Sequence, residues 1–155
     1  MPHRIGKLDQ GHPYIEITVS LDGKDGTGEK YTALIDTGYS GFVSLPLMAA
    51  LKLGLQPHTT VQYELANGKV SDPVPMALAH ACCCGDGFVS GLVGISEAPS
   101  VTVGMEFLRT CGKGLMVFST GIVVVDEKEF LDSMKAAANA LKEPPEPPGK
   151  AITAS

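Results

Sequence analysis

Apolar and polar residues alternate with period two along much of this chain, as they do in β-strands that bury one face. The clearest case is residues 14–21, where isoleucine, valine and leucine alternate with polar side chains. Glycines and aspartates at positions 22–28 form a turn between this strand and the next. Further strands are predicted at residues 29–35, 42–45, 59–65, 70–80, 101–103, 115–118 and 122–125.

Helical spacing of apolar residues is confined to three segments. Pro46 suits the first position of a helix and Gly54 its end, so a short helix is predicted between them. Residues 104–109 predict one or two helical turns. Over residues 126–141 the period changes from two to 3.6, which predicts a terminal helix with one apolar face.

The order of these elements favours one fold class. Many short strands with few helices indicate a mainly β, closed barrel in a single domain, not alternating βα units. We expect this domain to span residues 1–142, with its core at about 14–125. The glycine-rich residues 85–99 are interpreted as a loop with a small apolar insert at 88–95. Residues 143–155, rich in proline, are expected to be a disordered tail.

Charge and composition narrow the possible partners. The chain has a net charge of -5 and no cluster of lysine and arginine, whereas nucleic acids and anionic membranes attract basic surfaces. Neither is therefore an expected partner. The N-terminus lacks the apolar run of a signal peptide, and no window approaches the 18 or so apolar residues of a membrane span. The expected location is cytoplasmic.

One carboxylate stands out from this pattern. Asp36 follows directly on the apolar end of a predicted strand, in the sequence Asp36-Thr37-Gly38, and a second apolar strand begins at residue 42. A tight turn between two buried strands would hold this carboxylate at the end of the barrel, whereas a solvated turn aspartate needs no such flanks. Thr37, Gly38 and Ser40 are the candidates for supporting the turn, Thr37 through its hydroxyl.

Three segments of the chain resemble, in order and spacing, the retroviral-type (retropepsin-like) aspartic proteases and especially their small bacterial and archaeal relatives. Residues 33–46, around Asp36, look like the active-site segment of that family. Residues 63–69 resemble its flap hairpin, and Asn67-Gly68 is a strong hairpin signal in its own right. Residues 101–108 resemble the turn and short helix beneath the catalytic loop. The resemblance covers residues 15–125.

The resemblance implies a barrel of the retropepsin type and the activity of an aspartic endopeptidase. Each chain would supply Asp36 as its one catalytic residue, so a homodimer would act on a peptide or protein substrate, with no metal and no cofactor. Thr37 would pair with its own copy across the dimer. The flap residues that close over the substrate would be Leu65, Ala66, Asn67 and Gly68.

Two departures from the family pattern keep an alternative open. Tyr39 stands where many members carry a small residue, and residues 80–98 form a longer segment than expected. The chain could therefore be a dimerisation or peptide-binding module that has the fold without catalysis. The helix at 126–141 could pair with another copy or could pack on its own barrel.

A third hypothesis concerns sulfur ligands. Cys82, Cys83 and Cys84 follow His80, which could indicate a metal site or a thiol sensor. Adjacent cysteines do not have the spacing of a structural zinc site or of a disulfide framework. Reduced thiols that fill space inside a strand are the simpler interpretation.

Overall fold

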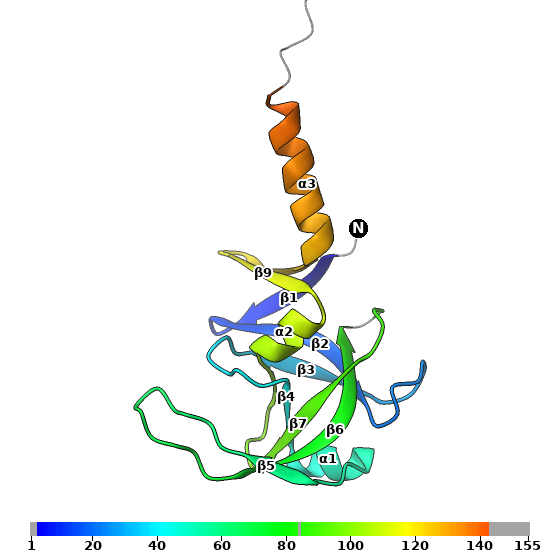
Figure 1. Ribbon diagram of the computed structural model, residues 1–155, viewed down its shortest axis with the longest axis vertical. Coiled ribbons are helices and arrows are strands. Elements are labelled where there is room, and N and C mark those ends of the chain that lie inside the picture. Colours follow the sequence, from blue (N-terminus) through cyan, green and yellow to red (C-terminus); the bar gives the residue numbers. More distant parts are fainter. Residues whose placement is uncertain (1–2, 84, 143–155) are drawn as a thin grey trace, which may run out of the picture.

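The computed structural model describes residues 3–83 and 85–142, and its elements are labelled in Figure 1. In chain order they are β1 (His3–Asp9), β2 (His12–Ser20), β3 (Glu29–Ile35), β4 (Val43–Pro46), α1 (Leu47–Leu53), β5 (Thr59–Val61), β6 (Val74–Cys83), β7 (Val89–Ser96), β8 (Val101–Val103), α2 (Met105–Thr110), β9 (Lys113–Phe118), β10 (Gly121–Asp126) and α3 (Glu127–Ala140). The predicted tail at 143–155 and Cys84 lie outside the described residues.

The strands close into a barrel. The sheet runs in the order β6-β7-β4-β8-β3-β2, and an additional antiparallel pairing of β2 with β6 joins its two ends. Strands β3 and β8 run parallel, as do β4 and β7, whereas the other barrel pairs are antiparallel. The closed, mainly β architecture expected from the sequence is confirmed, and closure leaves these strands with few open edges.

The barrel interior is filled by aliphatic side chains and two phenylalanines. Residues Ile17 and Val19 of β2 are fully buried, as the alternation along this strand predicts. The rings of Phe42 and Phe107, whose centroids are 5.6 Å apart, pack against each other beside the loop that carries Asp36. This contact holds α2 against the start of β4.

The prediction of a loop at residues 85–99 is wrong for residues 89–96. Strand β7 occupies Val89–Ser96 and pairs with both β6 and β4. Its glycines resemble loop residues in the sequence, but they make room for the core. A Cβ on Gly91 would lie 2.5 Å from the Phe42 ring, so a bulkier strand residue would displace that ring.

A second, smaller sheet extends the barrel. It contains β1, β10 and β9, and β1 joins it to the barrel by also pairing with β2. The β1–β2 hairpin turns at Gln10 and Gly11, which both have positive φ, as a two-residue turn of type I′ requires. No strand is predicted for this N-terminal segment from its sequence. It precedes the core expected at 14–125.

Helix α1 lies between the two residues predicted to bound it, and most of its large apolar side chains face solvent. Pro46 is its N-cap residue, and Gly54 ends it with a φ of 74°. Of the residues that recur at helical spacing, Leu47, Met48 and Leu51 are exposed and only Leu55, just beyond the helix, is buried. Within the helix the side chain that packs inward is Ala50. Helical periodicity alone therefore identified the helix but not its buried side.

Helix α3 projects away from the barrel, at the end opposite the loop between β5 and β6 (Figure 1). Its N-cap Asp126 accepts a hydrogen bond from the Glu129 backbone N–H at 3.1 Å. The Lys113 ammonium, on a side chain only 7% exposed, lies 3.6 Å from Asp126 and 3.0 Å from Asp86. These ion pairs tie the start of α3 to the tip of the β6–β7 hairpin. Across the described ranges, no helix is long and apolar enough to span a membrane.

Candidate active site

Asp36 begins a tight loop that starts where β3 ends. Its own Oδ1 accepts a hydrogen bond from the Gly38 backbone N–H at 2.9 Å, and its carbonyl oxygen accepts one from the Tyr39 N–H at 3.1 Å. Both bonds close the turn locally, so Asp36 itself fixes the turn. The hydroxyl of Thr37, expected to do so, is exposed and has no partner within residues 3–83 and 85–142.

The segment from Val103 to Met105 holds this loop in place through backbone hydrogen bonds. The Asp36 backbone N–H donates to the Val103 carbonyl at 3.0 Å, and the Met105 N–H donates to the Tyr39 carbonyl at 2.8 Å. Gly104 lies between these two bonds and donates to the Phe42 carbonyl at 3.0 Å. The turn and short helix predicted at 101–108 are therefore present, and they join both sides of the Asp36 loop.

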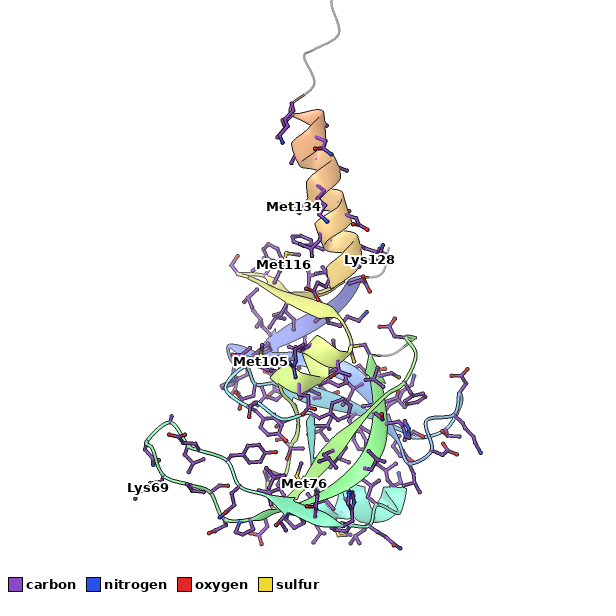
Figure 2. All side chains as sticks on the ribbon, viewed as in Figure 1. Lys69, Met76, Met105, Met116, Lys128 and Met134 are labelled. Atoms are coloured by element: carbon purple, nitrogen blue, oxygen red, sulfur yellow. The ribbon has the colours of Figure 1, made fainter. Side chains whose placement is uncertain are left out.

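The hairpin between β5 and β6 is the predicted flap-like element. Its closing bonds run from the Leu65 N–H to the Lys69 carbonyl at 2.7 Å and from the Gly68 N–H to the Leu65 carbonyl at 2.8 Å. Gly68 has a φ of 76°, whereas Asn67 does not have positive φ. This is a three-residue loop over Ala66, Asn67 and Gly68, not the two-residue turn that Asn67-Gly68 suggested. Lys69, labelled in Figure 2, lies near the outer end of the hairpin.

The Asp36 loop and this hairpin line one open cleft of about 420 Å³. Five of the eight predicted site residues contribute to its wall: Asp36, Gly38, Ser40, Leu65 and Ala66. Thr37, Asn67 and Gly68 do not line it. Asp36 is exposed and lines this space.

Sequence reasoning missed the residue that joins the two walls of the cleft. Tyr63, in the stem of the hairpin, packs edge-on against Tyr39, with centroids 5.5 Å apart and hydroxyl oxygens 3.5 Å apart. Burial, helped by the neighbouring Tyr63 hydroxyl, raises the pKa of Tyr39, so its phenol is neutral. Tyr39, which appeared in the sequence as a departure, thus connects the carboxylate loop to the hairpin. The two tyrosines are 24 residues apart, and no local pattern signals their contact.

Comparison with solved structures supplies the family context of this geometry. The chain superposes on a retropepsin-like aspartic protease from Rickettsia conorii with a TM-score of 0.56 and 20% sequence identity, over 79% of this chain and 89% of that one. The chain has the retropepsin fold. The EIAV protease bound to the inhibitor HBY-793 aligns at a TM-score of 0.48 with 15% identity, over 70% of this chain and 95% of that one. The Simian Foamy Virus (mac) protease aligns at a TM-score of 0.44 with 16% identity, over 62% and 91%. No protein-family model and no curated protein sequence matches the chain.

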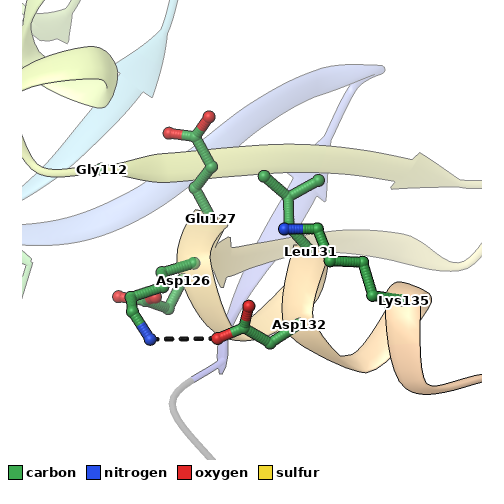
Figure 3. Close-up of a pocket in the computed structure, with 7 residues that line it drawn as sticks. Gly112, Asp126, Glu127, Leu131, Asp132 and Lys135 are labelled. Atoms are coloured by element: carbon green, nitrogen blue, oxygen red, sulfur yellow. Dashed lines mark hydrogen bonds and ion pairs between the residues drawn. The ribbon is translucent and has the colours of Figure 1, made fainter.

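Another hollow, of about 470 Å³, lies outside the part of this retropepsin fold that carries Asp36. It is lined by Gly112 and the first turns of α3 (Figure 3). Its wall carries the exposed ion pair of Lys128 and Asp132, 3.0 Å apart. Charged surface side chains that neutralise one another offer no convergent reactive groups, so the Asp36 cleft is the better candidate site.

The cysteine cluster gives the sensor hypothesis little support. The described residues contain no group of three or more His, Cys, Asp or Glu side chains placed to hold a metal ion. His80 has its Nδ1 3.3 Å from the Leu21 carbonyl oxygen, and Cys82 and Cys83 are buried. Burial, with Cys83 nearby, raises the pKa of Cys111 to about 12, which keeps this thiol protonated and unreactive near neutral pH.

Proposed function

We propose that this protein is an aspartic endopeptidase that acts as a homodimer, with Asp36 of each chain as a catalytic residue. The observation that carries the proposal is the placement of Asp36 in the wall of a cleft whose other wall is the hairpin with Leu65 and Ala66. A carboxylate that lines an open cleft beside a hairpin supports peptide hydrolysis by an activated water, with the hairpin closing over the bound peptide.

The chemistry requires two carboxylates. When two chains bring their Asp36 side chains together, the two like charges cannot both persist at close range, so the pair shares one proton. The ionised carboxylate removes a proton from a water molecule, which attacks the peptide carbonyl. The protonated carboxyl donates a hydrogen bond to the carbonyl oxygen and later protonates the leaving amine.

The remaining predicted site residues have supporting roles in this proposal. The exposed hydroxyl of Thr37 is available to a second chain and would hydrogen-bond to its own copy, which would keep the two loops rigid. Ser40 and Gly38 line the cleft beside the carboxylate. The hairpin with Leu65, Ala66, Asn67 and Gly68 would close over the substrate, and those of its backbone groups that make no bond within the hairpin would pair with an extended peptide.

The test is the substitution Asp36→Asn, which keeps the shape of the side chain but removes its charge and basicity. Cleavage of a peptide library, followed by mass spectrometry, is expected to fall by at least about 100-fold, the usual effect of losing a general base. Asp25→Asn is the matched control, because Asp25 is an exposed aspartate in the β2–β3 turn. It should cleave at the rate of the unmodified chain. Full activity of Asp36→Asn would refute the proposal.

The alternative function, a dimerisation or peptide-binding module without catalysis, makes a different prediction for the same variants. Peptides would bind in the cleft and remain intact. Their affinity would be equal in Asp36→Asn and Asp25→Asn, because recognition would depend on the walls around Tyr39 and Leu65 and not on the carboxylate.

A further inference from the structure

Helix α3 carries an apolar stripe that its own barrel does not cover. Phe130, Met134, Ala137 and Leu141 follow at spacings of four, three and four residues, which place them in line along one side of the helix. Phe130 is 38% exposed, Met134 56% and Leu141 88%, and no side chain of α3 is buried. Packing of the helix against its own barrel, one of the two possibilities open from sequence, is therefore not what the structure shows.

Between residues 130 and 141 this stripe bears no charge. Beyond the first turn, the charged side chains of α3 lie off the line of the stripe, and Lys128 with Asp132 forms the ion pair marked by a dashed line in Figure 3. From Phe130 onward, two copies of the stripe can therefore meet without bringing like charges together. Only Glu127, three residues before Phe130, continues the line with a charge, and it does so at the first turn of the helix.

We infer that the partner on this stripe is a second copy of the chain, with two α3 helices packed in parallel about a two-fold axis. This inference rests on the proposed function, in which the site of one chain is incomplete without a second Asp36. A stripe that is uncharged and lies along a helix axis is complementary to itself, as a two-fold symmetric contact requires.

The direction of the helices follows from where the barrel lies. Helix α3 projects from one end of the molecule, and the barrel with its Asp36 loop lies wholly beyond its N-terminal end (Figure 1). In an antiparallel pair the two barrels would lie at opposite ends of the helices and the two Asp36 side chains would be far apart. Only a parallel pair keeps both barrels at the same end.

The size of the contact indicates that the adjoining sheet takes part. A helix of 14 residues is about 21 Å long and about 10 Å wide, which is small beside the roughly 800 Å² per partner of a stable interface. Strand β9 is the outer strand of the small sheet, and Phe118 on it is 51% exposed. Met116 and Phe118 lie on the face opposite that of buried Ile122, which pairs with Val117. Figure 2 shows Met116 below Met134, on the part of the sheet at the α3 end of the molecule.

The first experiment measures self-association by analytical ultracentrifugation of the full chain. Met134→Lys places a charge in the stripe, whereas Asn139→Lys places the same charge off its line and serves as the control. Met134→Lys is expected to weaken dimerisation roughly tenfold or more, as loss of a central contact does, while Asn139→Lys dimerises like the unmodified chain. Equal dimerisation of all three, or an unmodified chain that stays monomeric, would overturn the inference.

The second experiment tests the direction of the helices. With Leu141→Cys, mild oxidation joins two chains covalently only if each residue 141 meets its own copy, as in a parallel pair. In an antiparallel pair it would meet Phe130 instead, and no covalent dimer would form, which would overturn the inference. Asn139→Cys and the unmodified chain control for cross-linking through the native cysteines.

These measurements do not depend on catalysis. A covalent Leu141→Cys dimer that cleaves no peptide would support the helix contact and count against the proposed activity. A Met134→Lys variant that stays dimeric and cleaves peptides would support the proposed activity and count against the helix contact.

Discussion

Gly104 is the residue at which the support of the Asp36 loop can be tested most directly. It has a φ of -107° and a ψ of -173°, a conformation open to alanine, so Gly104→Ala introduces no backbone strain of its own. The new methyl group is the whole perturbation. It would collide with the Gly41 carbonyl oxygen and lie 2.5 Å from the Tyr39 carbonyl oxygen and 2.6 Å from a Tyr39 ring carbon.

The cost follows from what the methyl group meets. Two of its three neighbours are backbone atoms, which cannot rotate away as a flexible side chain does. Overpacking of this kind costs about 1–3 kcal/mol, and the backbone contacts put Gly104→Ala at about 2–3 kcal/mol. For a domain of this size that corresponds to a decrease in Tm of roughly 5–10 °C. The loop is also expected to shift, because the bonds from Asp36 to Val103 and from Met105 to Tyr39 flank the collision.

The assay is urea denaturation of Gly104→Ala beside Gly87→Ala, at unchanged m-value so that the midpoints report stability. A Cβ on Gly87 has nothing within 4 Å, and this glycine does not need positive φ, so its variant should unfold like the unmodified chain. Equal midpoints for the two variants would show that the close approach of α2 to the Asp36 loop is not maintained in solution, and the reasoning would fail.

Two further predictions concern electrostatic contacts away from the cleft. Burial acts to lower the pKa of Lys113, but the hydrogen bond and charge of Asp86, together with the charge of Asp126, outweigh burial and raise this pKa. Lys113→Met would leave these carboxylates without their cation, so it should lower the free energy of unfolding by about 1–3 kcal/mol at pH 7. The exposed pair of Lys128 with Asp132 is screened by water, so Lys128→Met should leave the urea midpoint close to that of the unmodified chain; a larger loss there than in Lys113→Met would contradict the argument. Hydrogen bonds from Thr27 and the Lys24 backbone lower the pKa of Asp22 from 3.8 to about 2, so its contribution to stability is complete above pH 3.8 and is lost as the pH falls through about 2. Asp22→Asn should therefore flatten the pH dependence of unfolding over that interval, and an unchanged slope would argue against the Asp22 turn as the cause.

Features with a local cause could be predicted from the sequence. Pro46 and Gly54 bound helix α1 because each fits one helix end and not the other, and the change of period at residue 126 located α3 to within one residue. The Asp36 turn was found for the same reason. Its closing bonds join residues two and three apart, so everything that shapes it is contained in a few consecutive positions.

Features with a distant cause could not be predicted. Strand β7 has two glycines that signal a loop locally, and only the Phe42 ring, far away in sequence, explains why Gly91 belongs in a strand. Strand β1 gains its place by pairing with β10 at the other end of the chain. The contact of Tyr39 with Tyr63 likewise depends on how the barrel brings the hairpin over the loop.

The proposed activity likewise has one part that a single chain determines and one part that needs a second chain. One chain already holds the Asp36 loop in place, through its own turn and through the Val103 and Met105 bonds, so the shape of each half-site does not need a partner. The shared proton does need one, because it arises only from two close carboxylates. Dimerisation would thus act on the chemistry and not on the fold of the loop. For this reason the stripe on α3, although it is far from the cleft, can control activity. Weakening the contact at Met134 lowers the concentration of paired carboxylates and leaves each barrel intact. Activity should therefore fall with dilution more steeply in Met134→Lys than in Asn139→Lys.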